Sequence, residues 1–207
     1  LNSIIVAGSC ALLSTYFSTM TAYAIHAYEF KLKKAIFTFI LMVMMIPSQV
    51  TALGFIKLIG DVGLEDNLIP LIVPSIAAPV TFFYMKQYME SNLPLEIIEA
   101  ARIDGSSEFR TFNTMVFPLM RPAIAVQAIF TFVSSWNNYF TPALLLHEPE
   151  VKTLPILIAQ LRGADFLRFD MGQVYIMIAF SILPVVLVYM FLSRSIVQGL
   201  ASGSVKG

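Results

Sequence analysis

Five long stretches of this chain contain no Asp, Glu, Lys or Arg, and they constrain its fold more than any other feature. They cover residues 1–28, 35–56, 67–85, 122–147 and 171–193. Each has at least 19 residues, and about 20 helical residues span a hydrocarbon core of ~30 Å. Apolar residues follow one another almost without interruption, unlike the alternating pattern of a membrane barrel strand. The sequence therefore predicts an all-α membrane protein with five transmembrane helices.

Composition excludes several other classes of protein. Charged residues make up 13% of the 207 residues, whereas soluble domains have roughly 25%. The formal net charge is zero, which gives no electrostatic basis for binding nucleic acid. Cys10 is the only cysteine, and His26 and His147 have no Cys or further His near them, so we predict no disulfide and no metal site. No predicted span carries a carboxylate pair or a nucleophile beside a base, so we predict no catalytic residue.

The Lys and Arg residues between these stretches predict the orientation of the chain, because such residues are enriched in cytoplasmic loops. One set of loops holds nine of them and the alternate set holds four. The nine are Lys31, Lys33, Lys34, Lys86, Arg102, Arg110, Arg121, Arg194 and Lys206, and the four are Lys57, Lys152, Arg162 and Arg168. We therefore expect the C-terminus and residues 91–117 in the cytoplasm and residue 1 outside. Because Leu1 is not a methionine and would lie outside, we also expect a further helix ahead of it.

Residues 1–207 are predicted to form a single transmembrane domain. The outward loop at 57–66 is short. The second, residues 141–170, is longer and predicted to be extracytoplasmic, and Thr153–Leu161 within it can form an interfacial helix. No part of the sequence resembles a soluble domain, a repeat or a low-complexity segment.

Residues 91–117 are amphipathic, in contrast to their uniformly apolar surroundings. Pro94 can open a helix, and Glu96 suits the positive end of its dipole. Gly105 can adopt a positive φ, which would end the first helix and allow a second to begin. This pattern predicts a cytoplasmic helix–turn–helix. On periodicity alone, an interfacial segment lying flat on the membrane is an equal alternative.

The same segment carries a spaced motif. Glu99-Ala100-Ala101 is followed after three residues by Gly105, and after nine more by Met115-Val116-Phe117-Pro118. This spacing resembles the EAA loop of binding-protein-dependent ABC importer permeases, which reads EAA, three residues, G, nine residues and I-x-L-P. Met115 and Phe117 replace the Ile and Leu of that pattern, whereas the Glu, both Ala, the Gly and the Pro match in register.

Other stretches are similar to the carbohydrate branch of that family, the maltose-type permeases. They are Asn2-Ser3, Ala22-Tyr23-Ala24, Met45-Ile46-Pro47, Ser135-Trp136-Asn137-Asn138-Tyr139 and the ending Gly199–Gly207. The resemblance therefore covers nearly the whole chain. It lacks the first membrane helix that is usual in the family, in agreement with the orientation argument.

The resemblance implies a type I ABC importer permease fold in a bacterial or archaeal cytoplasmic membrane. It implies a permease for a sugar that works with a second permease subunit, two cytoplasmic ATPase subunits and an extracytoplasmic solute-binding protein. The loop would then be a coupling helix that binds the ATPase, with these residues at the contact: Glu99, Ala100, Ala101, Asp104, Gly105, Phe109 and Pro118. The chain has no G-x-x-x-x-G-K-[ST] loop, so we expect ATP and Mg on the ATPase partner and no cofactor here.

Polar side chains inside a span must face a partner or a cavity, because lipid offers no hydrogen bonds. The candidates for a translocation path are Gln49, Gln127, Ser135, Trp136, Asn137 and Asn138, with Thr51, Ser75, Thr81 and Ser134 as further polar residues of the spans. An aromatic ring beside amides suits a sugar. The alternative is structural, with the aromatic residues in an interfacial belt and the amides bonded to neighbouring helices.

Two other functions stay open at this point. One is an ABC importer permease for a non-sugar solute, such as an amino acid, a peptide or a metal complex. The other is a channel or secondary transporter without an ATPase. Ion-driven transporters usually need buried ionisable residues, and all five predicted spans lack Asp, Glu, Lys and Arg, which disfavours that second alternative.

Overall fold

The computed structural model describes residues 1–163 and 171–203, with side chains described up to residue 193 except at position 48. Every regular element in this part of the chain is helical. The principal helices are α1 (Asn2–Ala27), α2 (Lys33–Met44), α3 (Ser48–Asp61), α4 (Ile69–Ile72), α5 (Pro79–Asn92), α6 (Leu95–Ile103), α7 (Glu108–Thr111), α8 (Phe117–Leu119), α9 (Arg121–Trp136), α10 (Phe140–Leu145), α11 (Leu154–Arg162) and α12 (Met171–Gly203). Short 3₁₀ turns occupy Val73–Ile76 and Pro149–Val151, and a π-helical turn covers Phe112–Val116.

The predicted spans are present, but two of them are not single straight helices. Asn2–Ala27, Ile69–Asn92 and Met171–Ser193 are long and apolar enough to cross a membrane. The stretch 35–56 is instead divided between α2 and α3, which are bent by 97°. Pro47 lies at this break and precedes α3, since proline removes a backbone donor and ends a helix. Glu108–Leu119 and Arg121–Trp136 are likewise bent by 79°, and counting each bent pair as one span gives five.

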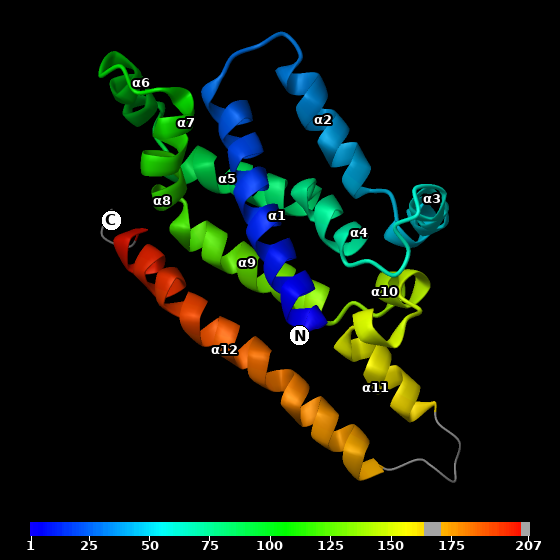
Figure 1. Ribbon diagram of the computed structural model, residues 1–207. Coiled ribbons are helices and arrows are strands. Elements are labelled where there is room, and N and C mark those ends of the chain that lie inside the picture. The colour runs from blue at the N-terminus through cyan, green and yellow to red at the C-terminus, as the bar shows by residue number, and fades with distance from the viewer. Residues whose placement is uncertain (164–170, 204–207) are drawn as a thin grey trace.

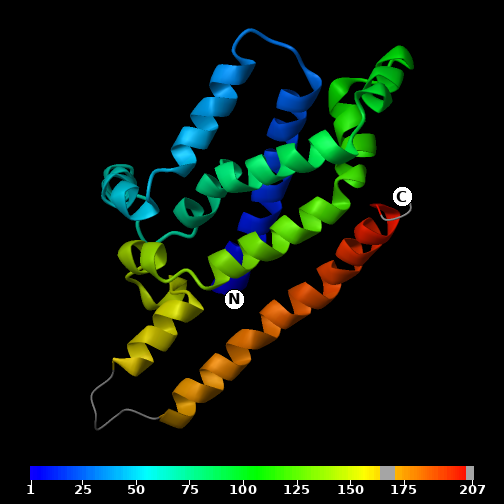
Figure 2. The same cartoon turned by 180° about the vertical axis from the view of Figure 1, so that it is seen from behind.

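Helix α1 lies at the centre of the molecule, between α5 and α9, as Figures 1 and 2 both show. Its buried residues are mostly small: Ser3, Ala7, Ala11, Ser14, Ser18 and Ala22. Small side chains let helix backbones approach closely in a membrane, where packing rather than hydrophobicity drives association. Towards the end of α1, larger side chains form the main core with α5, which contributes Met85 and Met89, and with Phe112 of the π-helical turn. This core fixes the start of the segment 91–117.

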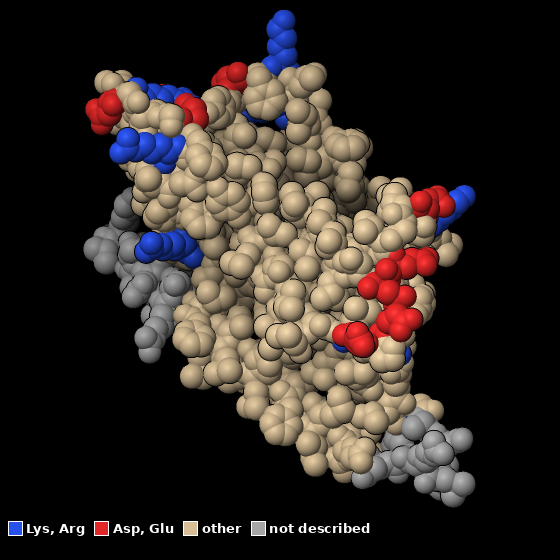
Figure 3. Space-filling model, in the orientation of Figure 1, with Lys and Arg blue, Asp and Glu red and all other residues tan. Residues whose placement is uncertain are grey.

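Helix α12 packs along α9 and forms one side of the molecule (Figure 2). Most of its large apolar side chains are exposed, among them Tyr175, Phe180 and Phe191. Figure 3 shows that, on the face viewed, charged side chains gather at the end that carries α6 and α7 and around α3 and α10, with a broad uncharged surface between. Exposed apolar surface between two charged ends is the arrangement that a lipid bilayer requires.

The N-terminus of α1 is attached to the segment that precedes α11. The Asn2 amide donates to the carbonyls of Glu150, at 2.7 Å, and Lys152, at 3.1 Å. Asp66, in the loop before α4, accepts a hydrogen bond of 2.8 Å from the Glu148 N–H and another from the His147 N–H. These N–H groups hold the pKa of the Asp66 carboxyl below its usual range. They connect the loop at 62–68 to the α10–α11 segment.

The predicted interfacial helix at Thr153–Leu161 is confirmed as a helix by α11, which begins one residue later. Residues 164–170 of the predicted outward loop, including Arg168, lie outside the described residues. So do Lys206 and the Arg194 side chain, all three of which entered the orientation argument.

Candidate functional sites: an exposed helical turn and a polar groove

The turn between α6 and α7 is built as the sequence predicts. Pro94 has an extended backbone and caps α6. Gly105 has φ +75°, in the left-handed region that costs other L-residues about 1–2 kcal/mol. The Ser106 N–H bonds the Ala101 carbonyl at 3.0 Å and the Gly105 N–H bonds the Arg102 carbonyl at 3.0 Å, which closes the end of α6 in a Schellman arrangement. The prediction of a positive φ at Gly105 is confirmed.

The faces of α6 divide the predicted coupling residues into two groups. Glu99, Ala100 and Asp104 are exposed, whereas Ala101 is 4% exposed and packs inward beside Ile98. Ala101 therefore stabilises the loop from within, and its side chain is not exposed for the predicted contact with another protein in this conformation. Ala100 remains available for that contact.

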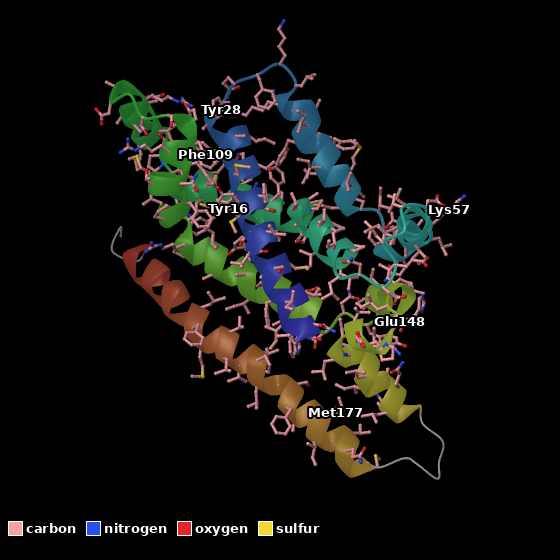
Figure 4. The ribbon with its side chains drawn as sticks, viewed as in Figure 1. Tyr16, Tyr28, Lys57, Phe109, Glu148 and Met177 are labelled. Atoms are coloured by element: carbon pink, nitrogen blue, oxygen red, sulfur yellow. The ribbon has the colours of Figure 1, made fainter. Side chains whose placement is uncertain are left out.

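Phe109 and Phe112 lie three positions apart but have different surroundings. Phe112 is 1% exposed and belongs to the main core, whereas Phe109 is 68% exposed. Figure 4 shows Phe109 on α7 at the same end of the molecule as Tyr28. An exposed phenylalanine on a short, otherwise polar helix is unfavourable in water and suits contact with lipid or another protein.

Four side chains fix the two helices of the turn to the end of α1. Arg102 on α6 donates from Nε to Glu108 on α7 at 2.6 Å, and the Tyr23 hydroxyl donates to the other Glu108 oxygen at 2.7 Å. The guanidinium of Arg102 also lies over the Tyr28 ring, 5.1 Å from its centroid. The hydrogen bond from Arg102, helped by the tyrosine hydroxyls, lowers the pKa of Glu108 to about 2.

Sequence reasoning missed this cluster. It used Arg102 only in the orientation argument and did not single out Glu108. The signal was that Arg102 and Glu108 lie six positions apart on opposite sides of Gly105. Two such residues can form a salt bridge only if the chain reverses at the glycine.

Phe112–Val116 and Pro118 lead the chain from the turn into α9. Pro118 has no N–H to donate to the Thr114 carbonyl, and the wider turn of Phe112–Val116 lies directly before it. The Tyr16 hydroxyl donates to Asn113 Oδ1 at 3.1 Å. Pro118 is partly buried, so it shapes the approach to α9 and is not on the exposed surface of the turn.

A second site is a groove of about 430 Å³ between α1, α5 and α9. It brings together several of the polar side chains predicted from the sequence: Ser75, Thr81, Gln127, Ser134, Ser135 and Asn138. Ser14 of α1 also lines the groove and donates to the Thr81 hydroxyl at 3.2 Å. Gln127 is 7% exposed, and its amide has no hydrogen-bond partner within the described part of the chain. It is therefore the buried polar group most able to bond a solute there.

Trp136, Asn137 and Gln49 do not join this groove. Trp136 is 6% exposed, stacks on Phe132 with a centroid separation of 5.7 Å, and donates from Nε1 to the Ser181 carbonyl at 3.1 Å. Trp136 and Asn137 line a separate pocket of about 350 Å³ beside α11 and α12. Gln49 is exposed near the start of α3. The Trp136 ring thus packs between α9 and α12, which favours a structural role for it, although the alternative we considered placed it in an interfacial belt.

No group of three His, Cys, Asp or Glu side chains suited to a metal ion occurs within residues 1–163 and 171–193. The chemistry available at the two sites is therefore hydrogen bonding, charge pairing and apolar contact.

The sequence of the chain is similar to the sequences of known transport permeases. The chain is 35% identical over 209 aligned positions to the arabinooligosaccharides transport system permease protein AraQ of Bacillus subtilis (strain 168), covering all of this chain and 72% of that protein. It is 32% identical to the melibiose/raffinose/stachyose import permease protein MelC of the same organism, again over all of this chain and 75% of the relative.

A solved structure has the same fold. The chain superposes with a TM-score of 0.78, at 24% identity, on a chain of a bacterial ABC transporter involved in the import of the acidic polysaccharide alginate. The match covers 93% of this chain and 72% of the other. Residues 14–202 also match the family model described as the inner membrane component of binding-protein-dependent transport systems. The chain therefore belongs to the family of binding-protein-dependent transport system inner membrane components, the family whose EAA pattern its sequence resembles.

Proposed function

We propose that this chain is a permease subunit of an ATP-driven importer, that it conducts an oligosaccharide, and that α6 and α7 bind a separate ATPase subunit. Relatives whose names specify arabinooligosaccharides and melibiose, raffinose or stachyose support the class of solute. The family itself supports an inner membrane location and a solute-binding protein outside. By the same reasoning, a second permease subunit and two ATPase subunits complete the transporter.

The observation that carries the coupling proposal is the exposed surface of the α6–α7 turn. Glu99, Ala100 and Asp104 face away from the rest of the chain, while Ile98 and Ala101 hold the helix in place. The turn is thus a rigid projection with a small, charged outer face. Such a face can enter a cleft of another protein. A movement of that protein would then reach α1 through the hydrogen bond between Glu108 and Tyr23.

The groove between α1, α5 and α9 supports a role in the solute path. Its lining combines hydroxyl and amide groups with apolar carbon, and a sugar presents both hydroxyl groups and apolar CH faces. Gln127 and Ser135 can each bond a hydroxyl group without carrying a charge. A neutral lining suits a neutral solute, since no charged side chain has to be compensated within the membrane.

Transport in reconstituted membranes tests this function. The permease is placed in vesicles with its ATPase and binding protein, and uptake of labelled raffinose or an arabinooligosaccharide is followed with and without ATP. Uptake that depends on both ATP and the binding protein is expected. Uptake without ATP would contradict the importer assignment in favour of a channel, and ATP-dependent uptake of an amino acid but no sugar would support the non-sugar alternative.

A further inference from the structure

Four lysines surround a pocket at the end of the molecule that carries α6 and α7. The pocket has a volume of about 400 Å³ and lies between the end of α1, the start of α2 and the end of α5. The lysines are Lys31, Lys33, Lys34 and Lys86, and two glutamates, Glu29 and Glu90, share the lining. The pocket therefore has a local formal charge of +2, in a chain whose overall charge is zero.

The two glutamates pair with only two of the four lysines. The Lys33 amine lies 2.6 Å from Glu29, and Lys86 pairs with Glu90 one turn further along α5. Lys31 and Lys34 have no carboxylate within salt-bridge distance in the part of the chain that the structure describes, and both are exposed. Their charges are thus available to an external anion. Lys86, at 7% exposure, lies deep in the pocket, paired with Glu90.

The remaining lining is apolar. Ile25, Phe30 and Phe37 border the same pocket, and Ile25 and Phe37 continue into the core formed with α5. Figure 1 shows the connection between α1 and α2 at one extremity of the molecule, where α1 ends and α2 begins. The pocket therefore has a basic rim over an apolar floor, at one end of the predicted membrane spans. This is the composition expected for an anionic lipid between two membrane helices.

We propose that this pocket binds the phosphate group of an anionic phospholipid, with Lys31 and Lys34 as the principal contacts and the acyl chains against Phe37. The shared chemistry is a phosphate, which free inorganic phosphate also provides. The apolar floor favours the lipid, since inorganic phosphate gains nothing from Ile25 or Phe37. The lysines here belong to the loops predicted to be cytoplasmic, and the cytoplasmic leaflet is the one rich in anionic lipids.

Native mass spectrometry of the protein in detergent tests the site. Phosphatidylglycerol is titrated against the wild type and against Lys31→Gln/Lys34→Gln, with phosphatidylcholine and inorganic phosphate as separate arms. We expect phosphatidylglycerol to bind the double variant roughly 10- to 30-fold more weakly than the wild type. Phosphatidylcholine should bind both proteins equally.

Two control variants separate the site from general charge effects. Lys57→Gln/Lys152→Gln removes the same charge from the loops predicted to be extracytoplasmic and should bind phosphatidylglycerol as the wild type does. Lys31→Arg/Lys34→Arg keeps the charge and should retain binding. Equal affinity of the wild type and Lys31→Gln/Lys34→Gln for phosphatidylglycerol would overturn the proposal. Displacement of the lipid by millimolar inorganic phosphate would overturn the assignment to a lipid.

Discussion

Arg102 and Glu108 form a salt bridge of 2.6 Å across the glycine turn between α6 and α7. The pair is more than a surface contact, because Tyr23 of α1 donates to the same carboxylate. One acidic side chain therefore joins both helices of the proposed coupling loop to the central helix of the bundle. Figure 4 shows the neighbouring Tyr28 at the same end of α1 as this junction.

Removing the Tyr23 hydroxyl should loosen the loop without unfolding the protein. Tyr23→Phe deletes one hydrogen bond to a charged group, which contributes about 1.5–3 kcal/mol. We expect faster amide hydrogen exchange in α6 and α7, with little change in α12. Tyr16→Phe, which removes a hydrogen bond to Asn113, is the matched control and should leave α6 unaffected. Unchanged exchange in α6 for Tyr23→Phe would show that the hydrogen bond does not hold the loop.

The loop should also respond to acid through Glu108. Its pKa is lowered from an ordinary value of 4.5 to about 2 in the folded protein. Because the pKa of Glu108 is lower in the folded protein, its ionised carboxylate stabilises the folded loop at pH values above the unfolded pKa of 4.5. This stabilisation is lost as the pH falls from about 4.5 to about 2. Local exchange in α6, corrected for the intrinsic rate, should be constant above pH 5 and rise below it. In Glu108→Gln, this added rise below pH 5 should be absent.

The groove makes a separate prediction about transport. Gln127→Met keeps the length of the side chain but removes its hydrogen-bonding amide, so sugar uptake should fall severalfold while the amount of assembled transporter stays constant. Gln87→Met makes the same change on an exposed position of α5 and should leave uptake normal. Normal uptake by Gln127→Met would remove Gln127 from the solute path.

The orientation can be tested with cysteine labelling in intact cells. A cysteine at Lys57 should react with an impermeant thiol reagent, whereas one at Ser107 should react only after the membrane is permeabilised. Cys10 is buried and lies 3.3 Å from the Leu71 carbonyl, so its background labelling should be low. Labelling of Ser107→Cys from outside would reverse the orientation and exclude a cytoplasmic ATPase contact at the loop.

Much of this arrangement could be predicted from local sequence signals. The charge-free stretches identify the spans because lipid excludes charge. Gly105 identifies the turn because the turn requires a positive φ, which glycine adopts at little cost. The inward face of Ala101 and the separation of Phe109 from Phe112 depend on how α6 and α7 pack against α1. Periodicity within one helix does not contain that information.

The same limit applies to the polar residues of the spans. Gln127 and Ser135 line the groove, which fits the expectation that polar side chains in a span face a partner or a cavity, because lipid would leave them unsatisfied. Trp136 looked equally suitable, yet its partners are Phe132 and the Ser181 carbonyl 45 residues away. The bend of 97° between α2 and α3 was also not foreseen, since Pro47 alone is compatible with a modest kink.

The most direct test of the account is the amount of ATPase subunit that co-purifies with Gly105→Val, together with sugar-stimulated ATP hydrolysis in reconstituted membranes. No atom beyond the adjacent residues lies within 4 Å of a Cβ added at Gly105, so the main expected effect of the substitution is backbone strain of about 1–2 kcal/mol. Gly105→Asn is the control, because asparagine tolerates a positive φ. We predict a clear loss of both quantities for Gly105→Val and near-normal values for Gly105→Asn. Wild-type recruitment and wild-type stimulated hydrolysis for Gly105→Val would contradict the assignment of α6 and α7 as the coupling element.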